Sequence, residues 1–354
     1  MTPLAKILSA QIKSYGPITI AEYMTQCLSH PEYGYYTSRD PIGSGGDFTT
    51  SPEVSQMFGE IIGAWVADIW MKLGTPKKLH LIELGPGRGT LMSDILRATC
   101  FLPEFHDALS VHLIDINDVL IDQQKEKLNE YSFISWHQNL SDIDFDAPVI
   151  FIGNEFLDAL PVHQYQKTKE GWAQRMVGWN ETQGFHIGLT QAPLDFGSAK
   201  EDDIKEVSPI QENILKDVAE VLKTYNGAGL LIDYGSAHSG FGDTLQALKD
   251  HAYVDIFETP GGADLTTHID FEWVGKILKQ NGLSVLSCAE QGQFLKSLGI
   301  EHRANALMQN QSEAIKKDIQ IQLDRLIAMD QMGELFKVIG FASSSDIKME
   351  GFTG

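Results

Sequence analysis

The sequence is poor in cysteine, with three such residues among 354, at the widely spaced positions 27, 100 and 288. This spacing excludes a disulfide framework and a paired-cysteine metal site. It also predicts a reducing compartment. Basic residues are scarce as well, because 27 lysines and arginines face 48 acidic residues and leave a formal charge of −21. A chain this acidic is not suited to coating DNA or RNA, so we expect no nucleic-acid partner.

Long apolar runs are also absent. The most apolar stretch, Ile61–Met71, is interrupted by Asp68 and is shorter than the roughly 20 residues that a membrane-spanning helix needs. The first residues show neither the apolar block of a signal peptide nor the Arg-rich character of a transit peptide. We therefore expect no membrane span and a cytoplasmic location.

Short apolar segments alternate with amphipathic segments between Lys78 and Gly235, which is typical of parallel strands joined by crossover helices. Near-continuous apolar strands indicate an α/β sheet covered on both faces. The predicted strands are Leu79–Leu84, Val111–Ile116, Phe133–His137, Val149–Gly153 and Gly229–Tyr234.

The flanking parts divide the chain into three. Residues 1–75 are predicted to be a helical segment with a Gly-rich turn, with helices at 3–13 and 52–73. Residues 76–300 form the core and carry an antiparallel insertion at about 162–208, where the polar stretch 193–206 is expected to be a loop. Residues 301–354 are predicted to form a C-terminal helical cap, with a helix at 313–332.

The strongest local signal is a Gly-rich turn that directly follows the first core strand. Glu83 and Leu84 precede Gly85, Gly87 and Gly89, and Thr90 ends the run before a predicted helix at 91–98. Glycine allows a tight bend and a close approach to a ligand. The spacing lacks the third glycine of a dinucleotide fingerprint, which weakens a nicotinamide interpretation. S-adenosylmethionine fits better, because its ammonium group suits the acid Glu83.

An acidic residue ends the next strand. Asp115 stands where a carboxylate accepts hydrogen bonds from both ribose hydroxyls of an adenosine. Strand, turn, helix, second strand and terminal acid together predict an adenosine-type ligand. A purely structural tight turn with a helix-capping aspartate remains the alternative.

A polar segment, Asn154-Glu155-Phe156-Leu157-Asp158, follows the fourth strand, where ligands of open α/β sheets bind. If the acceptor were a guanidinium, Glu155 and Asp158 could orient it through charge-assisted bonds, and alignment would supply most of the acceleration of a methyl transfer. The alternative is that Asp158 caps a turn and Glu155 is solvated.

His251, His268 and Asp270 match no usual ligand spacing, so no metal is expected there.

The chain resembles the MidA family of class I S-adenosylmethionine-dependent methyltransferases over about residues 16–299. The resemblance rests on the Gly-rich turn, the segment 154–162, Ile232–Gly235 and the runs 46–53 and 262–271. It implies a seven-stranded, mostly parallel sheet with helices on both faces. It also implies a protein arginine methyltransferase that forms symmetric dimethylarginine on a complex I subunit of the 49-kDa type, as in mitochondrial members. A homodimer is left open.

The family motifs fall on particular residues of this chain. They assign cofactor binding to Glu83, Gly85, Gly87, Gly89 and Asp115, where relatives usually have the longer glutamate, and place Asn154, Glu155 and Asp158 in the catalytic motif. Thr90 is included with the turn. Gln138 and Asn139 are expected near the adenine edge, and Phe48 and Thr50 in a lid over the cofactor. Ser51 and Glu53 of the same run could equally cap the helix that begins near Pro52.

Methylation of another acceptor, such as a small molecule, and a cofactor-binding assembly chaperone are the rival functions.

Overall fold

The computed structural model describes residues 1–38 and 49–352, which divide into two compact units. Unit 1 comprises residues 1–48, 158–213 and 239–268, and unit 2 comprises residues 49–157, 214–238 and 269–354. The predicted boundaries near 75 and 300 do not coincide with this division. Residues 56–72 form a helix of unit 2, and the N-terminal segment joins the insertion in unit 1.

Unit 2 is built on a mixed, mainly parallel sheet. Its hydrogen-bonded order within the described residues is β15-β17-β10-β5-β2-β3-β4, with the short strands β14 and β16 pairing beside it. The strands are β2 (Leu79–Leu84), β3 (Leu109–Ile114), β4 (Ile134–His137), β5 (Val149–Asn154), β10 (Gly227–Ser236), β14 (Ile269–Asp270), β15 (Ser284–Val285), β16 (Ala289–Glu290) and β17 (Phe336–Ala342). The seven-strand path and the α/β class confirm the expected fold.

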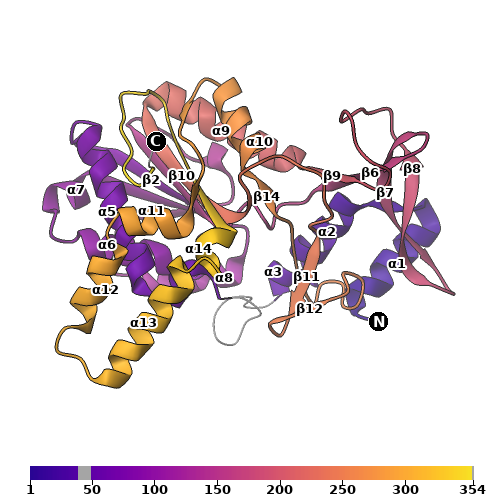
Figure 1. Ribbon diagram of the computed structural model, residues 1–354, viewed down its shortest axis with the longest axis horizontal. Helices are drawn as coiled ribbons and strands as arrows, with labels where there is room; N and C mark the ends of the chain where they lie inside the picture. The colour runs from indigo at the N-terminus through magenta and orange to yellow at the C-terminus, as the bar shows by residue number, and fades with distance from the viewer. Residues whose placement is uncertain (39–48, 353–354) are drawn as a thin grey trace. The chain divides into compact units, whose positions relative to one another are not determined.

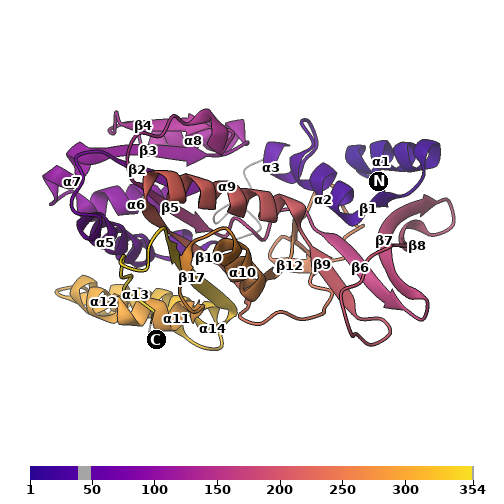
Figure 2. The same cartoon turned by 90° about the horizontal axis from the view of Figure 1, so that it is seen from above.

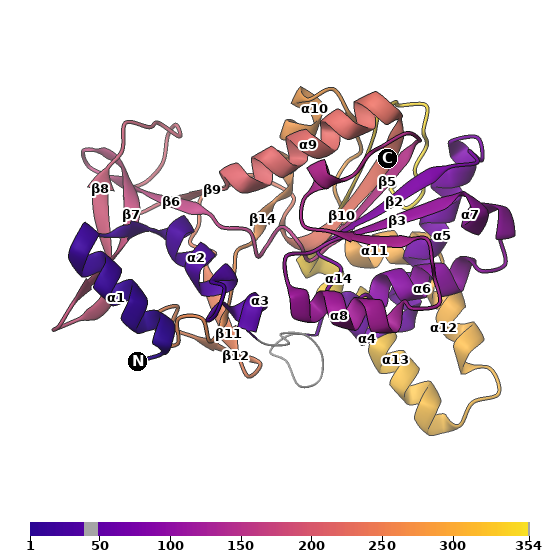
Figure 3. The ribbon, with the colours of Figure 1, turned by 180° about the vertical axis from the view of Figure 1, so that it is seen from behind.

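Helices cover both faces of this sheet. Figure 1 and Figure 3 show α5, α6 and α8 on one face and α9 and α10 on the other. The helices are α4 (Ser51–Val54), α5 (Gln56–Lys72), α6 (Thr90–Thr99), α7 (Pro103–Ala108), α8 (Asp118–Lys127), α9 (Pro209–Tyr225, which begins in unit 1), α10 (Phe271–Gln280), α11 (Gln291–Ser297), α12 (Ile300–Met308), α13 (Glu313–Ile327) and α14 (Met332–Leu335), with the 3-10 helix η1 (Leu140–Asp142). The main apolar core lies between α5, α6 and the strands.

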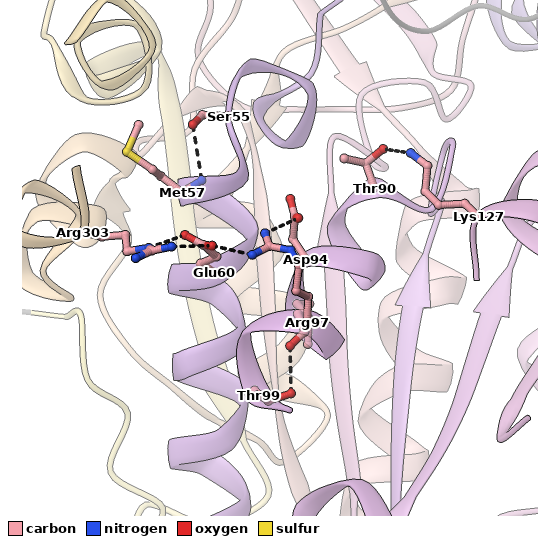
Figure 4. Close-up of polar contacts among 10 residues, drawn as sticks. Ser55, Met57, Glu60, Thr90, Asp94, Arg97, Thr99, Lys127 and Arg303 are labelled. Atoms are coloured by element: carbon pink, nitrogen blue, oxygen red, sulfur yellow. Dashed lines mark hydrogen bonds and ion pairs between the residues drawn. The ribbon is translucent and has the colours of Figure 1, made fainter. Parts of the chain in front are cut away.

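The predicted helix 52–73 is interrupted at Ser55. This residue has extended backbone, with φ −164° and ψ 140°, and its hydroxyl accepts a bond from the Met57 N–H at the start of α5 (Figure 4). A serine that caps the second helix therefore ends the first. Similarly, the predicted helix 313–332 stops at Ile327, and β17 enters the sheet where a helical cap was expected.

An ion-pair cluster around the buried Glu60 joins three helices of unit 2. The Glu60 carboxylate of α5 accepts bonds from Arg303 of α12 at 2.6 and 3.0 Å and from Arg97 of α6 at 2.7 Å, and Arg97 also donates to Asp94 (Figure 4). Burial alone would raise the pKa of Glu60, but the two guanidinium groups hold it below its ordinary value. The cluster attaches α12 to the helices that cover the sheet.

Unit 1 contains two antiparallel sheets and three helices among its described residues. One sheet has the order β1-β7-β6-β9 with β8 beside β7, and the other has the order β12-β11-β13. Its elements are α1 (Pro3–Tyr15), β1 (Ile18–Thr19), α2 (Ile20–Ser29), α3 (Tyr35–Ser38), β6 (His163–Thr168), β7 (Gly171–Asn180), β8 (Gly184–Gln191), β9 (Ile204–Val207), β11 (Gln246–Lys249), β12 (Ala252–Val254) and β13 (Asp264–Thr266).

The insertion is antiparallel, as predicted, but the stretch 193–206 is not all loop. Its end belongs to β9, which pairs with β6 from His163↔Val207 to Gln166↔Ile204. The helices α1 and α2 pack on one face of the larger sheet (Figure 2), where Leu8, Tyr23 and Val177 are buried together. Unit 1 thus has its own apolar core.

Candidate functional site

The Gly-rich turn connects β2 to α6 in unit 2. Gly85, Gly87 and Gly89 all have positive φ, at 65°, 54° and 73°. A Cβ on Gly85 would stand 2.8 Å from the Phe156 ring, and one on Gly89 would stand 3.3 Å from Leu128. The sequence analysis ascribed these glycines to a tight bend and to the close approach of a ligand. At Gly85 and Gly89 the backbone conformation and the chain's own packing already require glycine.

Glu83 is the least satisfied polar group of this turn. It lies at the end of β2 and is 2% exposed, and its Oε2 has no hydrogen-bond partner among the described residues. Burial, followed by the charge of Asp115, raises the pKa of Glu83 to about 8. A buried carboxyl group with an unpartnered oxygen is costly unless a donor or a cation reaches it. Glu83 Oε2 is therefore a candidate acceptor for a positively charged group.

Asp115 follows β3 and is half-buried beside the turn. Its Oδ1 accepts the Asn117 N–H at 2.9 Å, and its Oδ2 accepts the Gln124 side-chain amide at 2.9 Å. Burial raises the pKa of Asp115, whereas these bonds oppose the shift. Each carboxylate oxygen has two lone pairs, so a pair of hydroxyl groups can still be accepted.

The residues after β4 lie at the surface. Gln138 and Asn139 are both exposed, and the Asn139 backbone N–H donates to Asp142 at 3.0 Å at the start of η1. Asn139 therefore has a capping role here. Contact of either residue with an adenine edge stays a prediction.

Asn154 and Glu155 lie at the carboxyl end of β5. Glu155 has φ 51°, which is unusual for a residue with a side chain, and its backbone N–H donates to the Ile232 carbonyl at 2.8 Å. Its Oε1 accepts the Ser51 backbone N–H at 2.7 Å and the Asn154 side-chain amide at 3.0 Å. The Asn154 Oδ1 is buried without a partner among the described residues. Backbone strain of this kind is concentrated at functional sites.

The sequence analysis assigned no structural role to Asp233. This side chain is 1% exposed in β10, and it accepts the backbone N–H groups of Leu157 at 3.0 Å and Tyr234 at 2.9 Å. It therefore fixes the segment that follows Glu155. In the sequence, this role is indicated by an aspartate inside an otherwise apolar strand.

Asp158 begins the second segment of unit 1, whereas Glu155 belongs to unit 2. Asp158 is 5% exposed, and its carbonyl accepts the Thr267 N–H at 3.0 Å. Burial raises the pKa of Tyr36 well above its ordinary value, and the charges of Asp264 and Asp158 add to that effect. A joint role of Asp158 and Glu155 at one guanidinium stays a prediction.

The predicted lid residues have mixed outcomes. Phe48 lies outside the described residues. The Thr50 carbonyl accepts the N–H groups of Glu53 and Val54 at the start of α4. Thr90 donates to Glu53 Oε1 at 2.5 Å and accepts a bond from Lys127, which Figure 4 shows. Glu53 thus joins α4 to α6 through its side chain, and a ligand contact of Thr50 or Thr90 stays a prediction.

No group of three or more His, Cys, Asp or Glu side chains that could hold a metal ion occurs among the residues that the structure describes. Asp270 caps α10 by accepting the Trp273 N–H at 2.9 Å, which gives its side chain a structural role. Over residues 1–38 and 49–352, no helix combines the length and apolarity needed to cross a bilayer.

The open sheet of unit 2, with a Gly-rich turn and acidic residues at its strand ends, defines an adenosine-binding α/β enzyme. Comparisons with known proteins specify it further. The model of a family described as "Putative S-adenosyl-L-methionine-dependent methyltransferase" matches residues 61–289. The chain belongs to this family, and the resemblance found in the sequence is confirmed.

Among curated proteins, the chain is similar to "Protein arginine methyltransferase NDUFAF7, mitochondrial" of Xenopus tropicalis, with 35% identity over 96% of this chain and 85% of that protein. The protein of the same name from Homo sapiens is 34% identical over 95% of this chain and 82% of its own length. A solved structure of a "likely methyl transferase" from Burkholderia thailandensis, bound to S-adenosyl-homocysteine, has a TM-score of 0.81 and 25% identity over 99% of this chain and 92% of that chain.

The protein is therefore an S-adenosylmethionine-dependent methyltransferase, and its residues fit that cofactor. The unpartnered oxygen of Glu83 suits the ammonium group, and Asp115 suits the ribose hydroxyls. When bound, the cofactor supplies an activated methyl group on a sulfonium. The assignment of individual side chains to it stays a prediction.

Proposed function

We propose that this chain is a protein arginine N-methyltransferase. The printed names of the curated relatives support this, because they describe arginine methyltransferases that align with nearly the whole chain. The net charge of −21 also favours a cationic acceptor peptide over an acidic one.

The arrangement of Glu155 carries the proposal. Its left-handed backbone conformation and the bonds from Ser51 and Asn154 fix one carboxylate oxygen at the carboxyl end of β5. A fixed carboxylate accepts N–H bonds from a guanidinium and so orients one nitrogen of the acceptor. Because the leaving group of the methyl transfer is neutral, alignment is the main contribution required of the protein.

The proposal also covers the substrate, the methylated product and two neighbouring residues. Following the family resemblance, we propose symmetric dimethylation of an arginine on a complex I subunit of the 49-kDa type or a similar protein. Asn154 and Asp158 are proposed to assist Glu155. A cytoplasmic location and a homodimer stay predictions, and the curated relatives carry the label mitochondrial.

The test is mass spectrometry of arginine-containing peptides, and of matched peptides with lysine instead, after incubation with labelled S-adenosylmethionine. We expect dimethylation of arginine only. Glu155→Gln should lower the rate by about 100-fold or more, since a charge-assisted bond to the acceptor is lost. Its affinity for S-adenosylhomocysteine, measured by calorimetry, should change little.

Glu126→Gln is the matched control, because Glu126 is an exposed glutamate of α8. It should retain the full rate. Labelling of a small molecule and not of peptides would overturn the arginine proposal. An unimpaired Glu155→Gln enzyme would overturn the role of Glu155. Catalytically inactive variants that still support assembly of a client in cells would favour the chaperone function.

A further inference from the structure

A fully buried glutamine of α8 contacts three of the residues assigned to the cofactor. Gln124 Nε2 donates to the Gly87 carbonyl at 2.7 Å and to Asp115 Oδ2 at 2.9 Å. A Cβ on Gly89 would lie 3.4 Å from Gln124 Cγ, so the side chain also packs against that residue. One amide group thus connects the Gly-rich turn after β2 to the acid after β3.

The orientation of this amide follows from its third bond. Trp136 Nε1, on β4, lies 3.0 Å from Gln124 Oε1. An indole N–H can only donate, so the atom that faces it must be the amide oxygen. The amide nitrogen then faces two acceptors, the carbonyl and the carboxylate. All three bonds are compatible with this one orientation, whereas the flipped amide would set donor against donor at Trp136 and acceptor against acceptor at Gly87 and Asp115.

We propose that Gln124 is a positioning residue of the cofactor site, which fixes the Gly-rich turn and the ribose-binding carboxylate relative to each other. The proposal rests on the placement of the cofactor at Gly87 and Asp115. It does not depend on the acceptor that is methylated. Trp136 acts one step further out, because it holds the amide in the orientation that serves both acceptors.

The first test is calorimetric titration of the full chain with S-adenosylhomocysteine. Gln124→Leu should weaken binding by about tenfold or more, as expected when a buried bond to a charged group is lost. Trp136→Phe keeps the packing of a ring and removes only the N–H, so a smaller loss of about threefold to tenfold is expected. Wild-type affinity in Trp136→Phe and in a folded Gln124→Leu variant would overturn the proposal.

A second readout separates positioning from general stability. Gln124→Glu places a second carboxylate beside Asp115. When both carboxylates are ionised, their repulsion should weaken cofactor binding. In the wild type, affinity for S-adenosylhomocysteine is expected to rise between pH 6 and pH 8, because Glu83 gains its charge. The variant keeps Glu83, so its gain over the same range should be smaller than that of the wild type. An equal gain in both proteins would contradict the proposal.

The placement of the cofactor is tested separately by Asp115→Asn and Gly87→Val. If these variants bind normally, the cofactor lies elsewhere and the premise fails. If they lose binding while Gln124→Leu does not, only the positioning role fails. A double variant, Gln124→Leu with Asp115→Asn, should lose less affinity than the sum of the single losses, because both changes break one shared interaction.

Discussion

Each unit contains a glutamate in a buried or partly buried strand. The two glutamates differ in how many hydrogen-bond donors the protein supplies to the carboxyl group. Glu206, on β9 of unit 1, accepts bonds from Gln164 at 2.7 Å and from the Thr244 N–H and hydroxyl at 3.1 and 2.5 Å. Glu83 of unit 2 has an unpartnered oxygen and a second acid nearby. Burial raises the pKa of both, but only Glu206 has donors that oppose the shift.

This difference indicates different purposes. A buried acid whose oxygens are satisfied by neighbouring donors holds its own unit together. A buried acid that the protein leaves without a partner reduces stability, which is expected where a ligand supplies the missing partner. We therefore expect identical substitutions at the two positions to have opposite effects.

The largest effect is expected for Glu83→Leu. At pH 8, where about half of the Glu83 side chains are ionised, loss of the charge should weaken S-adenosylhomocysteine binding by roughly 100-fold. The free chain should become more stable, on the order of 1–2 kcal/mol, because an unpartnered buried acid is removed. Calorimetry and urea unfolding measure the two effects. A variant that is less stable than the wild type would contradict the comparison.

Glu206→Leu should behave in the reverse manner. It leaves the donors of Gln164 and Thr244 without their acceptor, so the loss of stability is expected to be about 2 kcal/mol. S-adenosylhomocysteine affinity should stay within about twofold of the wild type. Calorimetry and urea unfolding measure these two effects. A large loss of affinity would show that Glu206 also serves cofactor binding.

The pH dependence sharpens the comparison. The folded pKa of Glu83, about 8, is raised above its ordinary value, so its contribution to the stability of the free chain declines as the pH rises to that point. Cofactor binding favours the ionised form. Affinity should therefore increase with pH, by up to about tenfold per unit below pH 8, and level off above it.

Glu83→Gln should remove this dependence, and binding by the wild type near pH 7 should release close to one proton. Calorimetric titrations in buffers of different ionisation enthalpy count that proton. An unchanged slope in Glu83→Gln would assign the titration to another group.

The smallest effect concerns Tyr36 of unit 1, whose hydroxyl donates to the Asp264 oxygens at 2.9 and 3.1 Å. Tyr36→Phe should cost about 1 kcal/mol of stability, the contribution of an ordinary buried hydrogen bond. Thermal unfolding detects this loss. Binding of S-adenosylhomocysteine should not change, and a tenfold loss would contradict the assignment of a structural role to this contact.

The sequence predicted unit 2 more completely than unit 1. The strand Leu79–Leu84 has the predicted bounds, because a continuous apolar run is a local signal. The Gly-rich turn and the acids at the ends of β2 and β3 were also located, since strand ends can be located from the pattern.

Unit 1 depends on contacts that no local pattern records. Its strand β1 pairs with β7, joining Ile18 to Val177, and Tyr36 contacts Asp264. The stop at Ser55 was missed because one serine overrode a long helical pattern through its capping bond. Gln124 was missed because a glutamine on an exposed-looking helix gives no sign of burial.

The most direct test is a crystal structure of this chain with S-adenosylhomocysteine. We expect the ammonium group at Glu83 Oε2, the ribose hydroxyls on Asp115, and Gln124 still bonded to both Gly87 and Asp115. A ligand bound away from the turn after β2, with Glu83 still without a partner, would contradict it.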